Sequence, residues 1–249
     1  MLSSVKELFG YRIMAKDGNI GEAEDFLFDD RTWILRYVVV ASGLSRPDRI
    51  VLLIPSILKQ PEWRTHIIPV ELTKEKVENS PEMDRHKPLS RRYEIELHEH
   101  FGWERYWHSG TQPWSRLARS DPLSLEKRKE PREDGENQDP NLRSTKEAMG
   151  CRIQAYDGEI GHVDEFIASD KNWRLYYVVV DTRNWLPGRK VIISPGWIQA
   201  INWPEKKVHV ELNRELIKNS PKYDPTFPIN REYEERLYDY YGRPRYWDE

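Results

Sequence analysis

Two stretches of this 249-residue chain carry the side chains best suited to binding, and they end alike. Residues 93–107 read YEIELHEHFGWERYW, and residues 233–247 read YEERLYDYYGRPRYW. Each stretch closes on the same three residues, which are Arg105, Tyr106 and Trp107 in the first and Arg245, Tyr246 and Trp247 in the second. Arginine, tyrosine and tryptophan form the contacts that dominate protein interfaces, and aromatic side chains can equally fold back over a small core. These six residues are our candidates for an interaction site or for a cap on each core, and the sequence leaves both readings open.

The first stretch also contains candidate metal ligands, His98 and His100, with His108 close behind. Residues two apart on a helix point to different sides, so this pair cannot face one ion together. The second stretch has Tyr238 and Tyr240 in place of both histidines. We therefore interpret them as packing residues and predict no metal site.

The two stretches are the ends of two copies of one domain. The chain aligns with itself, without gaps, at a spacing of 140 residues. The sequence DGNIG at 17–21 recurs as DGEIG at 157–161, and WILRYVVV at 33–40 recurs as WRLYYVVV at 173–180. Such self-similarity indicates an internal duplication.

The residues between the copies have the composition of a tether. Seven basic and seven acidic residues and four prolines lie in 108–143, with few apolar residues to offset the entropy cost of ordering. We predict one domain at 1–107, a flexible polar linker at 108–143, and a second domain at 144–249. An alternative reading makes Trp114 and Leu117 part of a docking segment that folds on a partner.

Each copy is predicted to be mainly β. Asp17-Gly18 and Asp157-Gly158 favour a hairpin turn at the start of each copy. The alternation of the next strand predicts an inward face made of Trp33, Leu35, Tyr37 and Val39 in the first copy and of Trp173, Leu175, Tyr177 and Val179 in the second. Further strands are expected at 49–54, 67–72, 189–193 and 208–212. About five short strands with tight turns favour a small barrel or sandwich, and a barrel closes its edges. We predict two small β-barrels in tandem.

Two helices are predicted to follow the strands of each copy. Thr73 is the expected N-cap of a short helix that ends before an Asn-Ser-Pro sequence. A longer helix then carries Tyr93, Leu97 and Phe101 on one face and ends at Gly102. The second copy repeats this pattern at the same spacing.

The ordered set of these features resembles the PRC-barrel domain. The DGxIG hairpin, an acidic strand, the WxLxYVVV strand, a proline-ended strand and a VEL strand follow one another through 4–80 and 144–220. That domain is shared by the H subunit of the bacterial photosynthetic reaction centre and the ribosome maturation factor RimM. The YE…YGxxRYW tail is similar to that of stand-alone bacterial PRC-barrel proteins. The resemblance implies a small closed barrel that serves as an adaptor on larger assemblies, with no established catalytic residues.

Two departures from the family bear on function. The reaction-centre subunit has an N-terminal membrane helix, and we expect no such helix in this chain. The ribosome factor joins one PRC barrel to a different barrel, whereas both repeats here are similar to PRC barrels. Both differences argue against giving this chain the role of the reaction-centre subunit or that of the ribosome factor.

The sequence lacks the common motifs of catalytic sites. The chain has no GxxxxGK[ST] loop, GxGxxG turn, GxSxG elbow or HExxH helix. The single cysteine, Cys151, is interpreted as a packed strand residue. The acidic side chains Glu22, Glu24, Asp25, Asp29 and Asp30 could bind a hard cation. The second copy has His162, Asp164, Glu165, Ser169 and Asp170 at the equivalent positions, so only part of that charge is retained. We interpret them as a solvated strand face and predict a non-enzymatic protein without a cofactor.

The net charge and the hydropathy of the chain limit the classes of partner that we expect. With 39 basic and 42 acidic residues the formal charge is −3, which gives no overall field for nucleic acid. The longest apolar run, around 37–41, is far shorter than the roughly 20 residues that cross a bilayer. We expect a cytoplasmic adaptor that binds a protein or associates with itself, as a pseudo-dimer of repeats or a homodimer. The alternatives are a peripheral component of a membrane electron-transfer complex and a ribosome- or nucleic-acid-associated module.

Overall fold

The computed structural model describes residues 1–43, 49–83, 89–107, 141–182 and 189–248. Two compact units make up the chain. The N-repeat unit comprises Phe9–Thr32 and Arg36–Leu142, and the C-repeat unit comprises Met1–Leu8, Trp33–Leu35 and Arg143–Glu249. A short N-terminal segment of the first repeat thus lies with the second repeat. Most of the predicted flexible linker 108–143, with Trp114 and Leu117, lies outside the described residues. Its last two residues are described and belong to a strand, Leu142–Ser144.

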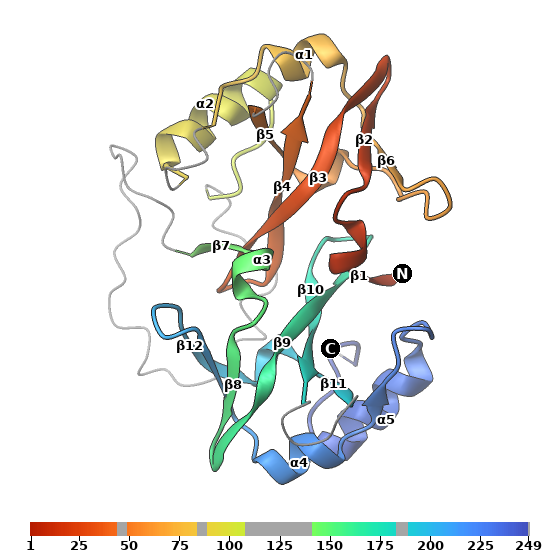
Figure 1. Ribbon diagram of the computed structural model, residues 1–249, viewed down its shortest axis with the longest axis vertical. Coiled ribbons are helices and arrows are strands. Elements are labelled where there is room, and N and C mark those ends of the chain that lie inside the picture. Colours follow the sequence, from red (N-terminus) through yellow and green to blue (C-terminus); the bar gives the residue numbers. More distant parts are fainter. Residues whose placement is uncertain (44–48, 84–88, 108–140, 183–188, 249) are drawn as a thin grey trace. The chain divides into compact units, whose positions relative to one another are not determined.

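A six-stranded sheet forms the body of the N-repeat unit (Figure 1). Its strands are β2 (Arg12–Ala15), β3 (Gly18–Asp29), β4 (Ile34–Ser42), β5 (Arg49–Leu53) and β6 (Ile67–Pro69), in the order β5-β4-β3-β2-β6, and β7 (Leu142–Ser144) also pairs with β3. The first hairpin is antiparallel, whereas β2 and β6 are parallel. A 3-10 turn (Pro55–Ile57) and the helices α1 (Lys74–Glu78) and α2 (Arg91–Phe101) complete the unit.

The C-repeat unit repeats this plan with eight strands. Its sheet follows the order β12-β13-β8-β9-β10-β11-β14, with β1 paired to β9. The strands are β1 (Leu2–Ser4), β8 (Arg152–Ala155), β9 (Gly158–Ser169), β10 (Leu175–Asp181), β11 (Lys190–Ile193), β12 (Ile198–Asn202), β13 (Lys207–Val210) and β14 (Lys222–Tyr223). The helical elements are 3-10 turns at Lys6–Leu8 and Pro195–Trp197 and the helices α3 (Thr145–Ala148), α4 (Arg214–Asn219) and α5 (Arg231–Tyr241).

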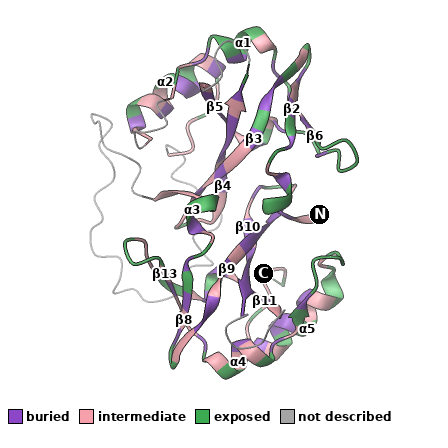
Figure 2. Ribbon diagram, in the orientation of Figure 1, coloured by how far each residue is buried: buried purple, intermediate pink, exposed green. Residues whose placement is uncertain are grey.

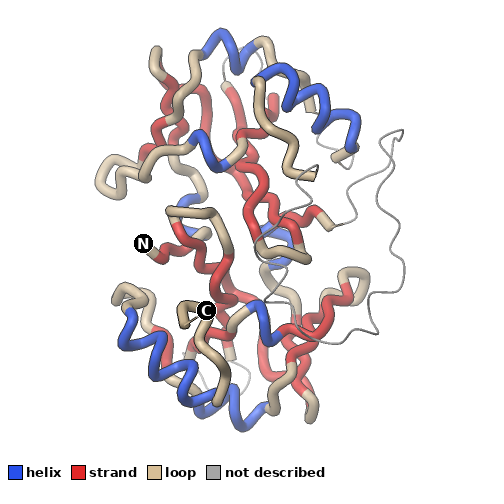
Figure 3. The backbone as a smooth tube through the Cα atoms, turned by 180° about the vertical axis from the view of Figure 1, so that it is seen from behind, coloured by secondary structure: helices blue, strands red, loops and turns tan. Residues whose placement is uncertain are grey.

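The mainly-β class is confirmed, but the sheets are open rather than closed. Within the described residues, neither strand order returns to its first strand, so the predicted closure into two barrels is wrong. One outermost strand of each sheet is very short, with three residues in β6 and two in β14. Short edge strands expose few unpaired backbone groups, which lets a sheet end without closing. Strands make up the body of each unit and helices lie at its periphery (Figure 3).

The buried side chains concentrate on the central strands (Figure 2). The predicted inward residues Leu35, Tyr37 and Val39 are buried, but so are Val38 and Val40 on the other face of β4. Trp33 lies just before the strand at a positive φ of 58° and is half-buried. The alternation therefore predicts the strand correctly. It identifies only one of the two buried faces, because both faces of the second half of β4 are buried.

The DGxIG motif has a structural role in both units. The Asp17 carboxylate accepts a hydrogen bond from the backbone amide of Lys74 at 2.8 Å, and so helps to cap α1. Gly21 has φ +149°, and a β-carbon there would collide with the backbone carbonyl of Ala41. Glycine is therefore required where β3 passes close to β4. The predicted N-cap Thr73 and the left-handed stop at Gly102 are confirmed.

Candidate functional site

A buried carboxylate lies beneath the aromatic end of the N-repeat unit. Glu94 has no exposed surface, and it shares one face of α2 with Leu97 and Phe101, three and seven residues on. An ionised carboxylate is costly to bury unless it is paired and hydrogen-bonded. The groups around Glu94 therefore define the candidate site.

Three side chains from three parts of the unit converge on this carboxylate. The hydroxyl of Tyr37 on β4 donates to Glu94 Oε1 at 2.8 Å, and the hydroxyl of Tyr106 donates to the same oxygen at 2.7 Å. Arg91 Nη1 lies 2.8 Å from Oε2, and its side chain is only 6% exposed. We call Glu94, Tyr37, Tyr106 and Arg91 the N-repeat glutamate cluster. It ties the aromatic end of the repeat to both the sheet and the helix.

The C-repeat unit builds the same arrangement from equivalent residues. Glu234 Oε1 accepts hydrogen bonds from Tyr177 and Tyr246, both at 2.7 Å. Arg231 lies 3.2 Å from Glu234 Oε2. Burial raises the pKa of Tyr177 well above its usual value, as it does for Tyr37, so both phenols keep the protons that they donate. These four residues form the C-repeat glutamate cluster.

The six residues singled out in the sequence are divided between the clusters and the surface. Tyr106 and Tyr246 belong to the clusters, and the Arg91 guanidinium lies 4.3 Å from the ring centroid of Trp107. In the C-repeat unit, Arg231 lies 4.0 Å from the ring centroid of Trp247. Arg105 and Arg245 instead pair with acidic residues of the preceding helix, Glu99 at 2.6 Å and Asp239 at 2.8 Å. All six are half-buried. The tyrosines and tryptophans therefore pack, and contact with a partner stays a prediction.

Sequence reasoning missed the glutamates, although Leu97 and Phe101 of the predicted apolar face are buried. The predicted apolar face began at Tyr93, but this residue is half-buried and donates its hydroxyl to the carbonyl of Pro81 at 3.2 Å. The inward face of α2 begins instead with two charged residues, Arg91 and Glu94. One signal could have identified them, since Arg and Glu occur three apart at the same positions of both repeats.

His98 makes the two clusters chemically different. Its Nδ1 lies 2.9 Å from the carbonyl of Glu104, which can only accept, and its Nε2 lies 2.9 Å from the Tyr37 hydroxyl. A neutral imidazole with its proton on Nδ1 thus competes with Glu94 for the single phenolic proton of Tyr37. Burial lowers the pKa of His98, and the positive charges of Arg105 and Arg91 act in the same direction. In the C-repeat unit Tyr238 occupies this position, and burial raises its pKa.

The N-repeat unit should lose stability in mild acid. Because the folded pKa of His98 lies below the unfolded value near 6.5, stability is present above that pH and is lost as the pH falls toward the folded pKa. Each unit of depression contributes about 1.4 kcal/mol. We expect the His98 ring signal to titrate below pH 6.5 in NMR spectra. The protection factors in α2, which correct for slower intrinsic exchange at lower pH, should fall between pH 7 and 5. His98→Gln should remove the pH dependence and His100→Gln should retain it; equal behaviour of the two variants would contradict this assignment.

His100 points away from His98 and serves another contact. Its Nε2 bonds to the carbonyl of Lys76 at 2.8 Å, and Tyr240 makes the equivalent bond to the carbonyl of Leu216 at 2.9 Å. Histidine and tyrosine thus anchor the longer helix to the shorter one in their respective units. Among the described residues, no group of three or more His, Cys, Asp or Glu side chains is arranged to hold a metal ion.

The other residues considered for chemistry, Cys151 and the acidic strand residues, make structural contacts. Cys151 is buried, and burial raises the pKa of its thiol, which disfavours the nucleophilic thiolate. Asp29, from the predicted acidic strand face, pairs with Arg36 at 3.1 Å and accepts from the backbone amide of Arg31 at 2.9 Å. These contacts fix a turn.

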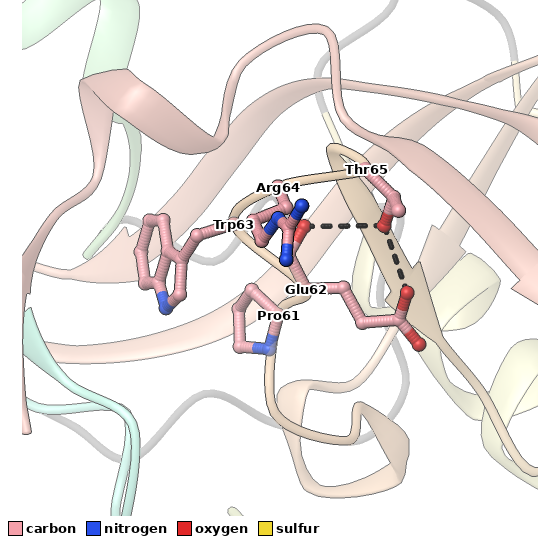
Figure 4. A pocket seen from close by; sticks show the side chains of 5 residues that line it. All are labelled: Pro61, Glu62, Trp63, Arg64 and Thr65. Atoms are coloured by element: carbon pink, nitrogen blue, oxygen red, sulfur yellow. Dashed lines mark hydrogen bonds between the residues drawn. The ribbon is translucent and has the colours of Figure 1, made fainter.

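A surface hollow lies at the loop Pro61–Thr65 (Figure 4). The Thr65 hydroxyl donates to the Glu62 carboxylate at 2.8 Å, while the Trp63 indole extends to the other side and is 39% exposed. Its walls come from one short loop. We assign no function to it.

Comparisons with known proteins leave the family open. No protein-family model matches the chain, and no curated protein matches it in sequence. In the part of the chain that the structure describes, no helix has the length and apolar character to cross a membrane.

Proposed function

We propose that the chain is a non-enzymatic, cytoplasmic adaptor of the PRC-barrel type, whose repeats bind a partner protein through their aromatic and arginine ends. The observation that supports this most strongly is the pair of glutamate clusters. Each holds a half-buried tyrosine and tryptophan in a fixed geometry beside an arginine. A binding surface that is already ordered loses less entropy on association.

The arginine of each end is partly exposed. The side chains of Arg105 and Arg245 are 29% and 30% exposed, and their ion-pair partners on the helices are more exposed still. Surface ion pairs contribute at most about 1 kcal/mol to stability, so these arginines can be changed with little effect on folding. Arginine, tyrosine and tryptophan together are the residue types enriched where interface energy concentrates.

The test is quantitative capture of protein partners from a native lysate. A chain with Arg105→Glu and Arg245→Glu is expected to retain at least about tenfold less of the specific partner than the unchanged chain, as a loss of roughly 1.4 kcal/mol or more at a hot spot requires. The matched control reverses one exposed arginine in the helix that precedes each end, with Arg92→Glu and Arg236→Glu, and should bind normally. If both double variants capture the same amount, the ends are not the binding surface.

A further inference from the structure

The first eight residues of the chain complete a unit to which they are not adjacent in sequence. Met1–Leu8 belongs to the C-repeat unit, although the next residue, Phe9, belongs to the N-repeat unit. Strand β1 pairs antiparallel with the last residues of β9 (Figure 1), so that Ser4 lies opposite Ile167. The amide of Val5 then donates to the carbonyl of Phe166 at 2.9 Å.

Side chains as well as the backbone recognise this segment. Val5 is fully buried and Leu8 is 3% exposed. The Ser4 hydroxyl donates to the carboxylate of Glu165, itself 5% exposed. Lys6 lies 3.2 Å from Asp164, whose side chain is only 9% exposed. The edge of β9 therefore recognises small polar, apolar and basic residues in that order.

The chain carries this recognition sequence twice. Leu-x-Ser-Val-Lys-Glu at 2–7 recurs as Leu-x-Ser-Thr-Lys-Glu at 142–147. The first residues of each copy form a strand, and β7 pairs with β3 as β1 pairs with β9. The backbone amide of Asp30 also donates to the carbonyl of Asn141 at 2.8 Å, just before the second copy. Each segment thus adds a strand beside the long strand of a repeat other than its own.

We propose that the edge of β9 is an exchangeable strand-docking site that also accepts the Leu2–Leu8 segment of a second copy of this chain. The docked segment is held in the C-repeat unit by non-covalent contacts, so its occupancy depends on the effective concentration that its covalent connection provides, on the order of millimolar. A second copy offers the identical segment and displaces it by mass action, which is the usual route to segment-swapped dimers. This inference deepens the proposed binding role, on which it rests, by naming one partner and its surface.

The experiment measures binding of a fluorescent peptide of residues 2–8, LSSVKEL, to full-length chains. Val5→Asp in the chain places a charge at a fully buried position and should undock the chain's own segment. We expect saturable peptide binding to this variant, and at least about tenfold weaker binding to the unchanged chain, where the attached segment competes. A peptide carrying Val5→Asp should not bind, and one carrying Glu7→Ala, at an exposed position, should bind normally.

A second variant and a mixing experiment test the proposal independently. If Val5→Asp prevents folding, the chain with Ser4→Ala and Lys6→Glu removes the polar contacts instead and should show the same gain of peptide binding. Mixed isotope-labelled and unlabelled unchanged chains should form mixed dimers by native mass spectrometry as their concentration approaches about 1 mM. Absence of peptide binding to a folded variant, or equal binding to the variant and the unchanged chain, overturns the docking site. Either result leaves partner capture by Arg105 and Arg245 unaffected, so the two proposals fail separately.

Discussion

Glu94→Gln is expected to destabilise the N-repeat unit by about 3 kcal/mol. The substitution keeps the size of the side chain but leaves the buried Arg91 facing a neutral amide, and breaking a buried ion pair on one side typically costs 3–5 kcal/mol. The two phenols that donate to Oε1 keep an acceptor only if the amide adopts one orientation. Because the chain has two units, whole-chain unfolding need not be two-state, and hydrogen exchange resolved by segment is the appropriate measurement. Exchange should accelerate in β4 and α2.

The same helix supplies the matched control. Glu96 lies two residues on, is 50% exposed and pairs with Arg92 at 3.0 Å in an i,i+4 surface contact. Glu96→Gln should cost no more than about 0.5 kcal/mol, as such pairs do. The C-repeat unit of the Glu94→Gln chain should exchange as before. Similar losses from both substitutions would mean that the carboxylate of Glu94 has no special structural role.

Features with local causes are the ones that the sequence predicts well. The Asp17-Gly18 turn, the Thr73 cap and the Gly102 stop each depend on a few neighbouring residues, and all three are present. Barrel closure depends on pairing between short strands far apart in the chain, for which no local pattern exists. The placement of Met1–Leu8 in the other unit is non-local for the same reason.

The aromatic residues of the candidate site could be predicted from the sequence, but its buried charged residue could not. Tyr106 and Trp107 attract notice because large aromatic residues recur at the same place in both repeats. Glu94 lies among the apolar residues of α2, where a search for apolar periodicity expects no charge, since charged residues are rarely buried unless paired. Its burial depends on Tyr37, which lies 57 residues earlier and reaches it only in the folded sheet.

Cutting the linker is expected to leave the two halves of the chain associated. The first half would end after residue 107 and still carry Met1–Leu8, which lies in the C-repeat unit with Val5 and Leu8 buried. A protease recognition sequence inserted within 108–140 allows the cut to be made in the full chain. After cleavage the two fragments should co-elute in size-exclusion chromatography instead of separating as independent domains.

The N-terminal segment can be tested as the cause of that association. Val5→Asp should let the fragments separate after cleavage, because burying an unpaired charge among apolar groups costs several kcal/mol. Glu7→Ala changes an exposed residue of the same segment and should leave them together. Separation of the unchanged fragments would mean that the exchanged segment is too weak to hold them, and the two aromatic ends would then act as independent sites on a tether. Co-elution that depends on Val5 would mean that the N-terminal segment holds the two fragments together without the linker. A partner protein could then bind both aromatic ends in one complex.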